Sequence, residues 1–159
     1  MYFWRIHKLK QELVASPLSD RQLLPYLLLY SALTAAAFMV PIESAGPWDI
    51  VGGSWSVVLA VFGTVYVYRR NGGSEGEHLL QRILTIGWVV GVRWGAALAC
   101  LFMAYFSAAE ILGEVSENTT WYEAALLGLA EGLLYWRIGQ HVSDVATGGV
   151  RPDTSPERA

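Results

Sequence analysis

The sequence predicts an all-α, polytopic membrane protein, in which a bundle of four transmembrane helices follows a short amphipathic helix at the membrane interface. Only 16% of the 159 residues are charged, whereas a soluble domain has roughly 25%, and the charges lie in short stretches. Between them are four apolar segments, each near the about 20 residues that a helix needs to cross a bilayer: residues 23–42, 50–68, 83–106 and 121–139. Lipid offers the backbone no hydrogen-bond partners, so each span is predicted to be helical.

The N-terminal segment, 1–18, is predicted to lie along the membrane surface as a helix. Apolar residues recur in it at helical spacing, and aromatic and basic side chains accompany them, which is typical of interfacial helices. The residues assigned to the membrane surface are Trp4, Arg5, Lys8 and Lys10. The alternative is a tail that only the nearby lipid orders. Ser16 and Pro17 end this segment.

The first span is predicted to open at a capping box, because Ser19 is followed by Gln22 at the required spacing. Pro25 leaves two possibilities: the helix begins nearer Leu24, or it bends at the proline. The apolar run is longer than the typical 7–15-residue core of a signal peptide, so we expect the segment to be retained.

The loop between the second and third spans contains Asn71-Gly72-Gly73, which is typical of a tight turn. Ser74 and Glu77 have capping-box spacing, so the third helix is expected to begin in the cytosol and to enter the membrane near residue 83. The loop lacks the Gly-Lys-Ser/Thr sequence of a P-loop, which argues against nucleotide binding. Residues 141–159 are predicted to be a flexible cytoplasmic tail.

The sequence "NGGSEGEHLLQRILTIGWVVGVRW" resembles small uncharacterised bacterial four-span inner-membrane proteins. The residues that carry this resemblance are Asn71, Gly72, Gly73, Gly76, Leu80, Arg82, Trp88 and Arg93. The resemblance covers about a sixth of the chain and implies no activity.

The basic residues predict the orientation of the spans. Of the 11 lysines and arginines, all except Arg93 precede the first span, lie between the second and third, or lie at or beyond the end of the fourth. By the positive-inside rule these regions are cytoplasmic. We therefore expect a multi-pass protein of the cell inner membrane with both termini in the cytoplasm.

Small residues form a ridge along the third span, because they recur every four residues at Gly87, Gly91, Gly95 and Ala99. Such ridges allow the backbones of membrane helices to approach closely. A second glycine pair with this spacing, Gly128 and Gly132, lies in the fourth span. Both faces are predicted to pack against other helices, and they indicate a homo-oligomer or a partner membrane subunit.

Arg93 is the one basic residue far from both ends of an apolar span, and it lies about 16 Å along the helix axis from Arg82. Glu131 is at a similar depth in the fourth span. An unpaired charge at mid-membrane costs a few kcal/mol, so the two residues are predicted to form an intramembrane charge pair. Either this pair only fixes the packing of two helices, or it belongs to a path for ions or protons.

The sequence contains no recognisable catalytic constellation. Its three histidines do not have the spacing of a metal site, and its single cysteine, Cys100, can form no disulfide within the chain. We expect no catalytic residues, no metal, no cofactor and no nucleic-acid partner. The lipid bilayer is the expected environment, and the expected function is that of an interaction or accessory protein rather than an enzyme. The alternative is a small oligomeric ion or proton channel, or a transporter component, that uses Arg93 and Glu131.

Overall fold

A computed structural model describes residues 5–37, 46–112 and 119–148 of the chain. These residues form an all-α structure, as predicted. Its elements are α1 (Ile6–Ala15), α2 (Asp20–Ala37), α3 (Pro47–Arg70), the short 3-10 helix η1 (Gly73–Glu75), α4 (Leu79–Leu112) and α5 (Trp121–Ala146).

Two of the described helices, α3 and α4, are long and apolar enough to cross a membrane. Only 11% of the residues in the most apolar part of each are buried within the protein, so most of their apolar side chains face outward. In α2 the described apolar stretch, Gln22–Leu33, is shorter, and residues 38–42 of the predicted first span lie outside the described residues. The structure thus supports membrane helices at α3 and α4, while the four-span bundle remains a prediction.

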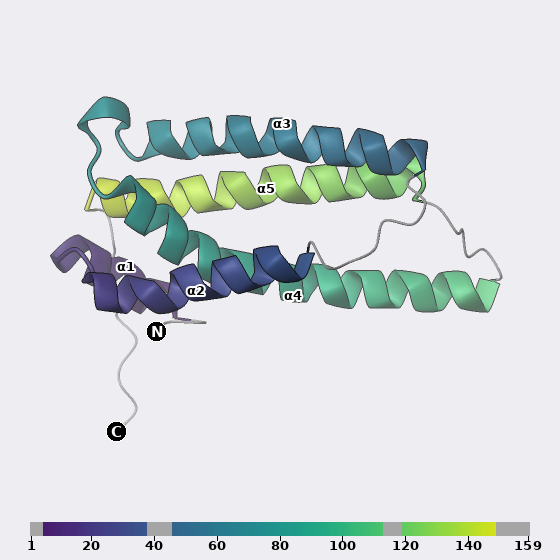
Figure 1. Ribbon diagram of the computed structural model, residues 1–159, viewed down its shortest axis with the longest axis horizontal. Helices are drawn as coiled ribbons and strands as arrows, with labels where there is room; N and C mark the ends of the chain where they lie inside the picture. The colour runs from purple at the N-terminus through teal and green to yellow at the C-terminus, as the bar shows by residue number, and fades with distance from the viewer. Residues whose placement is uncertain (1–4, 38–45, 113–118, 149–159) are drawn as a thin grey trace, which may run out of the picture.

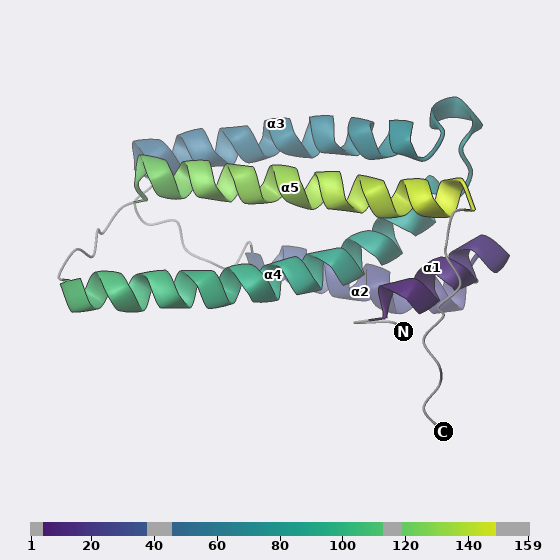
Figure 2. The same cartoon turned by 180° about the vertical axis from the view of Figure 1, so that it is seen from behind.

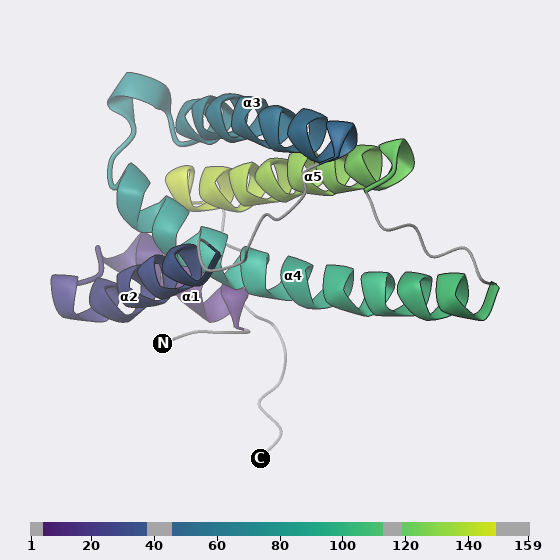
Figure 3. The same cartoon turned by 45° about the vertical axis from the view of Figure 1, so that its right-hand side comes forward.

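The long helices alternate in direction. α3 and α5 lie side by side and run the same way, whereas α2 and α4 run the opposite way (Figures 1 and 2). α4 contacts both α2 and α5, and α1 packs against α4 and α5 at the end of the bundle where η1 lies. From there α4 continues beyond the N-terminal end of α5 (Figure 3).

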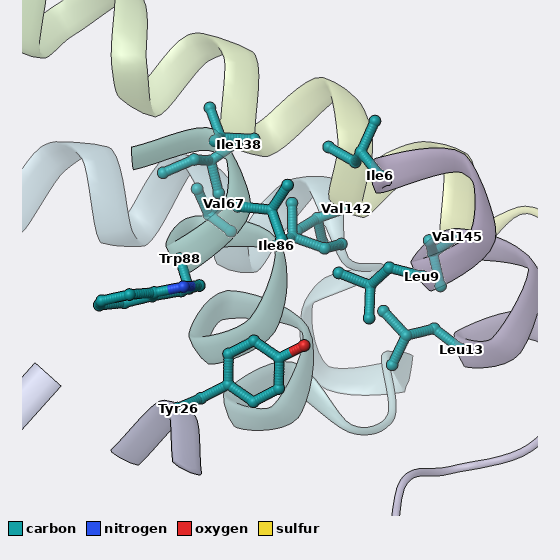
Figure 4. Packing of buried hydrophobic residues seen from close by; sticks show 12 residues of the cluster. Ile6, Leu9, Leu13, Tyr26, Val67, Ile86, Trp88, Ile138, Val142 and Val145 are labelled. Carbon is teal, nitrogen blue, oxygen red and sulfur yellow. The ribbon is translucent and has the colours of Figure 1, made fainter. Parts of the chain in front are cut away.

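The buried core lies at the η1 end of the bundle, and every α-helix contributes to it (Figure 4). The apolar residues of α1 recur at helical spacing, so they all face the same way. They pack against α4 and α5. The core is built from Ile6, Leu9, Leu13, Tyr26, Val67, Ile86, Trp88, Val89, Val90, Ile138, Val142 and Val145.

Polar side chains mark the beginnings of three helices. At the entry to α2, the Ser19 backbone N–H donates to Gln22 Oε1 at 2.9 Å, and Pro25 lies inside the helix without displacing its start. The Asp49 carboxylate accepts from the backbone N–H of Gly46 at 2.8 Å, before α3. At α5 the Glu123 carboxylate accepts from the Thr120 backbone at 2.7 Å. Such contacts satisfy backbone donors that a helix leaves unpaired at its first turn.

Two predicted boundaries differ from the structure. The Ser74–Glu77 capping box does not open a helix, because residues 73–75 form η1 and α4 begins at Leu79. The left-handed backbone of Gly72 (φ 102°) and His78 (φ 57°) reverses the chain between α3 and α4 and so delays the helix start. The expected tail also begins later than residue 141, because α5 continues to Ala146 and buries Val142 and Val145 in the core.

Candidate functional site

α3 and α5 meet along a seam in which aromatic rings cover glycines. A Cβ atom added to any of these glycines would come closer than 3 Å to a ring atom, so the close approach depends on the missing side chain. The seam consists of three pairs: Trp55 on Gly128, Tyr135 on Gly63 and Tyr66 on Gly139. Gly128 belongs to the predicted packing pair. Gly63 and Gly139 were not predicted, because neither has a glycine or alanine four residues away.

Glu131 points into this seam. Its Oε2 accepts a hydrogen bond from Ser56 Oγ at 2.6 Å, which links α5 to α3. Gly132, the neighbouring glycine of the predicted packing pair, has no described atom within 4 Å of a Cβ placed on it. The carboxylate therefore has a polar partner inside the protein, and that partner is a serine hydroxyl rather than an arginine.

The structure does not bring Arg93 and Glu131 together, because no ion pair joins them among the described residues. Their depths do agree: Trp94 Nε1, next to Arg93, donates to the carbonyl of Ala130 at 3.0 Å. The directions in which the two side chains point differ. Arg93 opens onto a groove beside Trp136 of α5, which lies roughly 140° around the helix from Glu131 at 100° per residue.

Arg93 lines a groove between α1, α4 and α5, which we call the basic groove. Its volume is about 240 Å³. The polar and aromatic residues of its lining are Arg93, Trp94, Trp136, Arg137 and His141, and the aliphatic ones are Ile6, Val90 and Leu133. Both arginine side chains are exposed, and neither forms a hydrogen bond or ion pair within the described part of the chain. The sequence did not predict this groove.

His141 lines the basic groove near the C-terminal end of α5, beyond the predicted fourth span. Burial, together with the nearby Lys10 and Arg137, lowers the pKa of His141 to about 4. Asp144, whose carboxylate is 3.9 Å from His141 Nδ1, opposes this shift only partly. The imidazole is therefore neutral at physiological pH, in surroundings that are already cationic.

The glycine ridge of α4 is covered only at its beginning. At Gly87 an added Cβ would lie 3.0 Å from the Tyr30 hydroxyl of α2. Gly91 and Gly95 have no described atom within 4 Å of the corresponding position, and Ala99 is exposed. Within the described residues, the ridge thus remains open beyond Gly87.

The residues assigned to the membrane surface have different environments. Arg5 and Lys8 are exposed, whereas Trp4 lies outside the described residues. Lys10 is only 6% exposed, and its ammonium group pairs with the Asp144 carboxylate at 2.5 Å. This is a correction to the surface assignment of Lys10: the side chain is turned inward because α1 packs against the end of α5.

Hydrogen bonds of the Asn71 side chain stabilise the turn between α3 and α4. Asn71 is 2% exposed, and its amide group accepts from Arg82 at 2.7 Å and donates to the Glu77 carbonyl at 3.2 Å. A Cβ atom at Gly76 would lie 2.1 Å from the Asn71 carbonyl oxygen. These contacts give Asn71 and Gly76 structural roles in the turn.

Comparisons with models of known protein families, with curated proteins and with solved structures find no match for this chain. Among the described residues, no group of three or more His, Cys, Asp or Glu side chains could hold a metal ion. Arguments about function therefore depend on the seam, the open ridge and the basic groove.

Proposed function

We propose that this chain is an integral inner-membrane interaction protein with four spans and both termini in the cytoplasm. It assembles with a second copy of itself through the open ridge of α4. The observation that carries this proposal is the space beside Gly91 and Gly95, where no described atom of another helix lies within 4 Å of an added Cβ.

The alternating helix directions support four spans. α2 and α4 run one way and α3 and α5 the other, as consecutive membrane crossings require (Figure 1). α3, α4 and α5 have 24, 34 and 26 residues, respectively, and each exceeds the about 20 needed to span. The basic residues at the α3 end and the α4 start, Arg69, Arg70 and Arg82, belong to the η1 end of the bundle, which is cytoplasmic by the positive-inside rule.

The chemistry of the ridge supports self-association. In lipid, apolar surface alone gives little drive for helices to associate, and close backbone packing at small residues supplies it instead. A ridge of this kind is self-complementary, so a second copy related by twofold symmetry can present the same surface. Met103 and Phe106 continue the exposed apolar surface of α4 and are 64% and 52% exposed.

The channel hypothesis gains no support from the two charged residues on which it was based. Glu131 is hydrogen-bonded to Ser56 in the α3–α5 seam, whereas Arg93 opens onto the basic groove on another side of α5. The two residues therefore do not line a shared path within the described structure.

The proposal is tested by placing leucine on the ridge. Gly91→Leu and Gly95→Leu should each shift the wild-type oligomer toward monomer in native mass spectrometry from mild detergent, because the side chain separates the two backbones. Gly53→Leu is the matched control, since Gly53 is an exposed helical glycine of α3 with no described atom within 4 Å. A wild-type monomer, or an oligomer that ignores both ridge substitutions, would overturn self-association through α4.

A further inference from the structure

Arg93 and Arg137 lean toward the same space. Side chains on an α-helix tilt toward the N-terminus of the helix. α4 and α5 run in opposite directions (Figure 1), so Arg93 tilts toward the η1 end and Arg137 tilts toward the other end. Both side chains line the basic groove.

Two like charges line one groove, and the groove lining supplies no anion to balance them. None of the eight lining residues is acidic, and neither arginine has a hydrogen-bond or ion-pair partner in the described part of the chain. Asp144 lies near His141 but is paired with Lys10.

A second basic cavity provides a useful contrast. It has a volume of about 520 Å³ at the η1 end and is lined by Arg69, Arg70 and Arg82. Glu75 and Glu77 line the same cavity, and Arg82 already donates to Asn71. Its charges are largely balanced from within, whereas those of the basic groove are not.

The basic groove leads from Arg93 toward the headgroup region, because His141 in its lining lies near the C-terminal end of α5, which is cytoplasmic in the proposed topology. Trp94 and Trp136 contribute indole rings, which favour the boundary between hydrocarbon and water. Val90 and Leu133 add aliphatic surface beside the two arginines. A guanidinium group binds phosphate with paired hydrogen bonds, and basic pockets between membrane helices on the cytoplasmic side are suited to anionic headgroups.

We propose that the basic groove binds a phosphate group between Arg93 and Arg137, and that this phosphate is the headgroup of an anionic phospholipid from the cytoplasmic leaflet. This inference rests on the proposed membrane topology, though not on self-association. It gives Arg93 a counter-ion that the protein itself lacks. The about 240 Å³ of the groove far exceeds the ~10–15 Å³ that a single water needs, so a phosphate group can enter.

The test measures binding of short-chain phosphatidylglycerol, short-chain phosphatidylcholine and inorganic phosphate to the full chain in mild detergent by titration calorimetry. Phosphatidylglycerol should bind more tightly than phosphatidylcholine. Arg93→Gln and Arg137→Gln should each weaken its binding about fivefold, since a basic residue near an anionic surface contributes about 1 kcal/mol. Arg93→Lys should lose less affinity than Arg93→Gln, because it keeps the charge but not the paired hydrogen bonds of the guanidinium group.

Lys8→Gln is the matched control, because Lys8 is an exposed cation of α1 that does not line the groove. It should leave binding nearly unchanged. Inorganic phosphate that binds as tightly as phosphatidylglycerol would support the phosphate site but assign it to a soluble anion. Equal affinity for the two lipids without phosphate binding, or equal losses in Lys8→Gln and the groove variants, would overturn the proposal.

Native mass spectra of the same samples separate this proposal from the previous one. Gly95→Leu should change the oligomeric state and keep phosphatidylglycerol selectivity. Arg93→Gln should keep the oligomeric state and weaken phosphatidylglycerol binding. Circular dichroism checks that each variant is folded; because both arginines are exposed, their substitution should leave the helical signal intact.

Discussion

The α3–α5 seam makes a quantitative prediction at Gly63. In Gly63→Ala the new methyl group would lie 2.3 Å from Tyr135 Cγ and 2.5 and 2.6 Å from the two Cδ atoms, whereas carbon atoms prefer about 3.5–4.0 Å. A small movement of the Tyr135 hydroxyl end cannot relieve this clash, because the contacting atoms are the ring atoms closest to the backbone. Overpacking of this kind costs about 1–3 kcal/mol.

Gly53→Ala provides the matched reference for this substitution. Gly53 lies on the same helix with no described atom within 4 Å, so both variants gain the same helix propensity, up to about 1 kcal/mol. The difference between them therefore isolates the clash. Unfolding followed by circular dichroism in mild detergent should give Gly63→Ala a Tm roughly 2–12 °C below that of Gly53→Ala.

A double-mutant cycle tests whether Tyr135 is the cause. In a Tyr135→Ala background the ring is absent, so Gly63→Ala should lose its penalty and behave like Gly53→Ala. If Gly63→Ala and Gly53→Ala unfold at the same temperature, or if the penalty persists without the ring, the seam does not have the close packing described above.

Three further predictions concern the ends of the bundle. Asn71→Ala should reduce the free energy of unfolding by about 1.5–3 kcal/mol, measured by the same unfolding assay, because Arg82 loses a buried acceptor. In a Cys100→Ala background, single cysteines at Ser44 and Asn118 should be labelled from outside the cell and one at Ser74 should not; external labelling at 74 would contradict the topology. Finally, because the pKa of His141 is lowered from 6.5 to about 4 in the folded protein, the unfolded chain binds the extra proton between these values. Stability should therefore be fully present above pH 6.5 and fall as the pH approaches 4, and His141→Gln should reduce this dependence.

Much of the helical architecture could be predicted from the sequence, because apolar length and turn residues are local signals. The predicted 50–68 and 83–106 segments lie inside α3 and α4. Local signals failed where contacts across the chain decide the outcome. α5 continues past 139 because Val142 and Val145 pack in the core shared with α1. The aromatic partners of Gly63 and Gly139 are likewise distant in sequence, so no repeat indicated them.

For the candidate site, the sequence indicated the level of a side chain along the helix axis but not the direction in which it points. Counting residues along the helix axis placed Arg93 near the level of Glu131, and the Trp94–Ala130 hydrogen bond agrees with that depth. The direction of Glu131 around α5 depends on which face of α5 meets α3, and the sequence alone did not specify that face. Ser56, seventy-five residues earlier, receives the carboxylate instead.

The direction of the Arg93 side chain explains how the chain accommodates a cation within an apolar span. A membrane helix tolerates arginine when the side chain reaches a polar partner or the headgroup region. The tilt of α4 side chains directs Arg93 toward the η1 end, where Arg137 and the indoles of Trp94 and Trp136 line the same groove. An internal acid in that groove would neutralise part of the arginine charge and weaken the attraction for an outside anion. Because no acidic residue lines the groove, and Glu131 and Asp144 contact Ser56 and Lys10 instead, the positive charge of the groove remains available to an anion from the membrane.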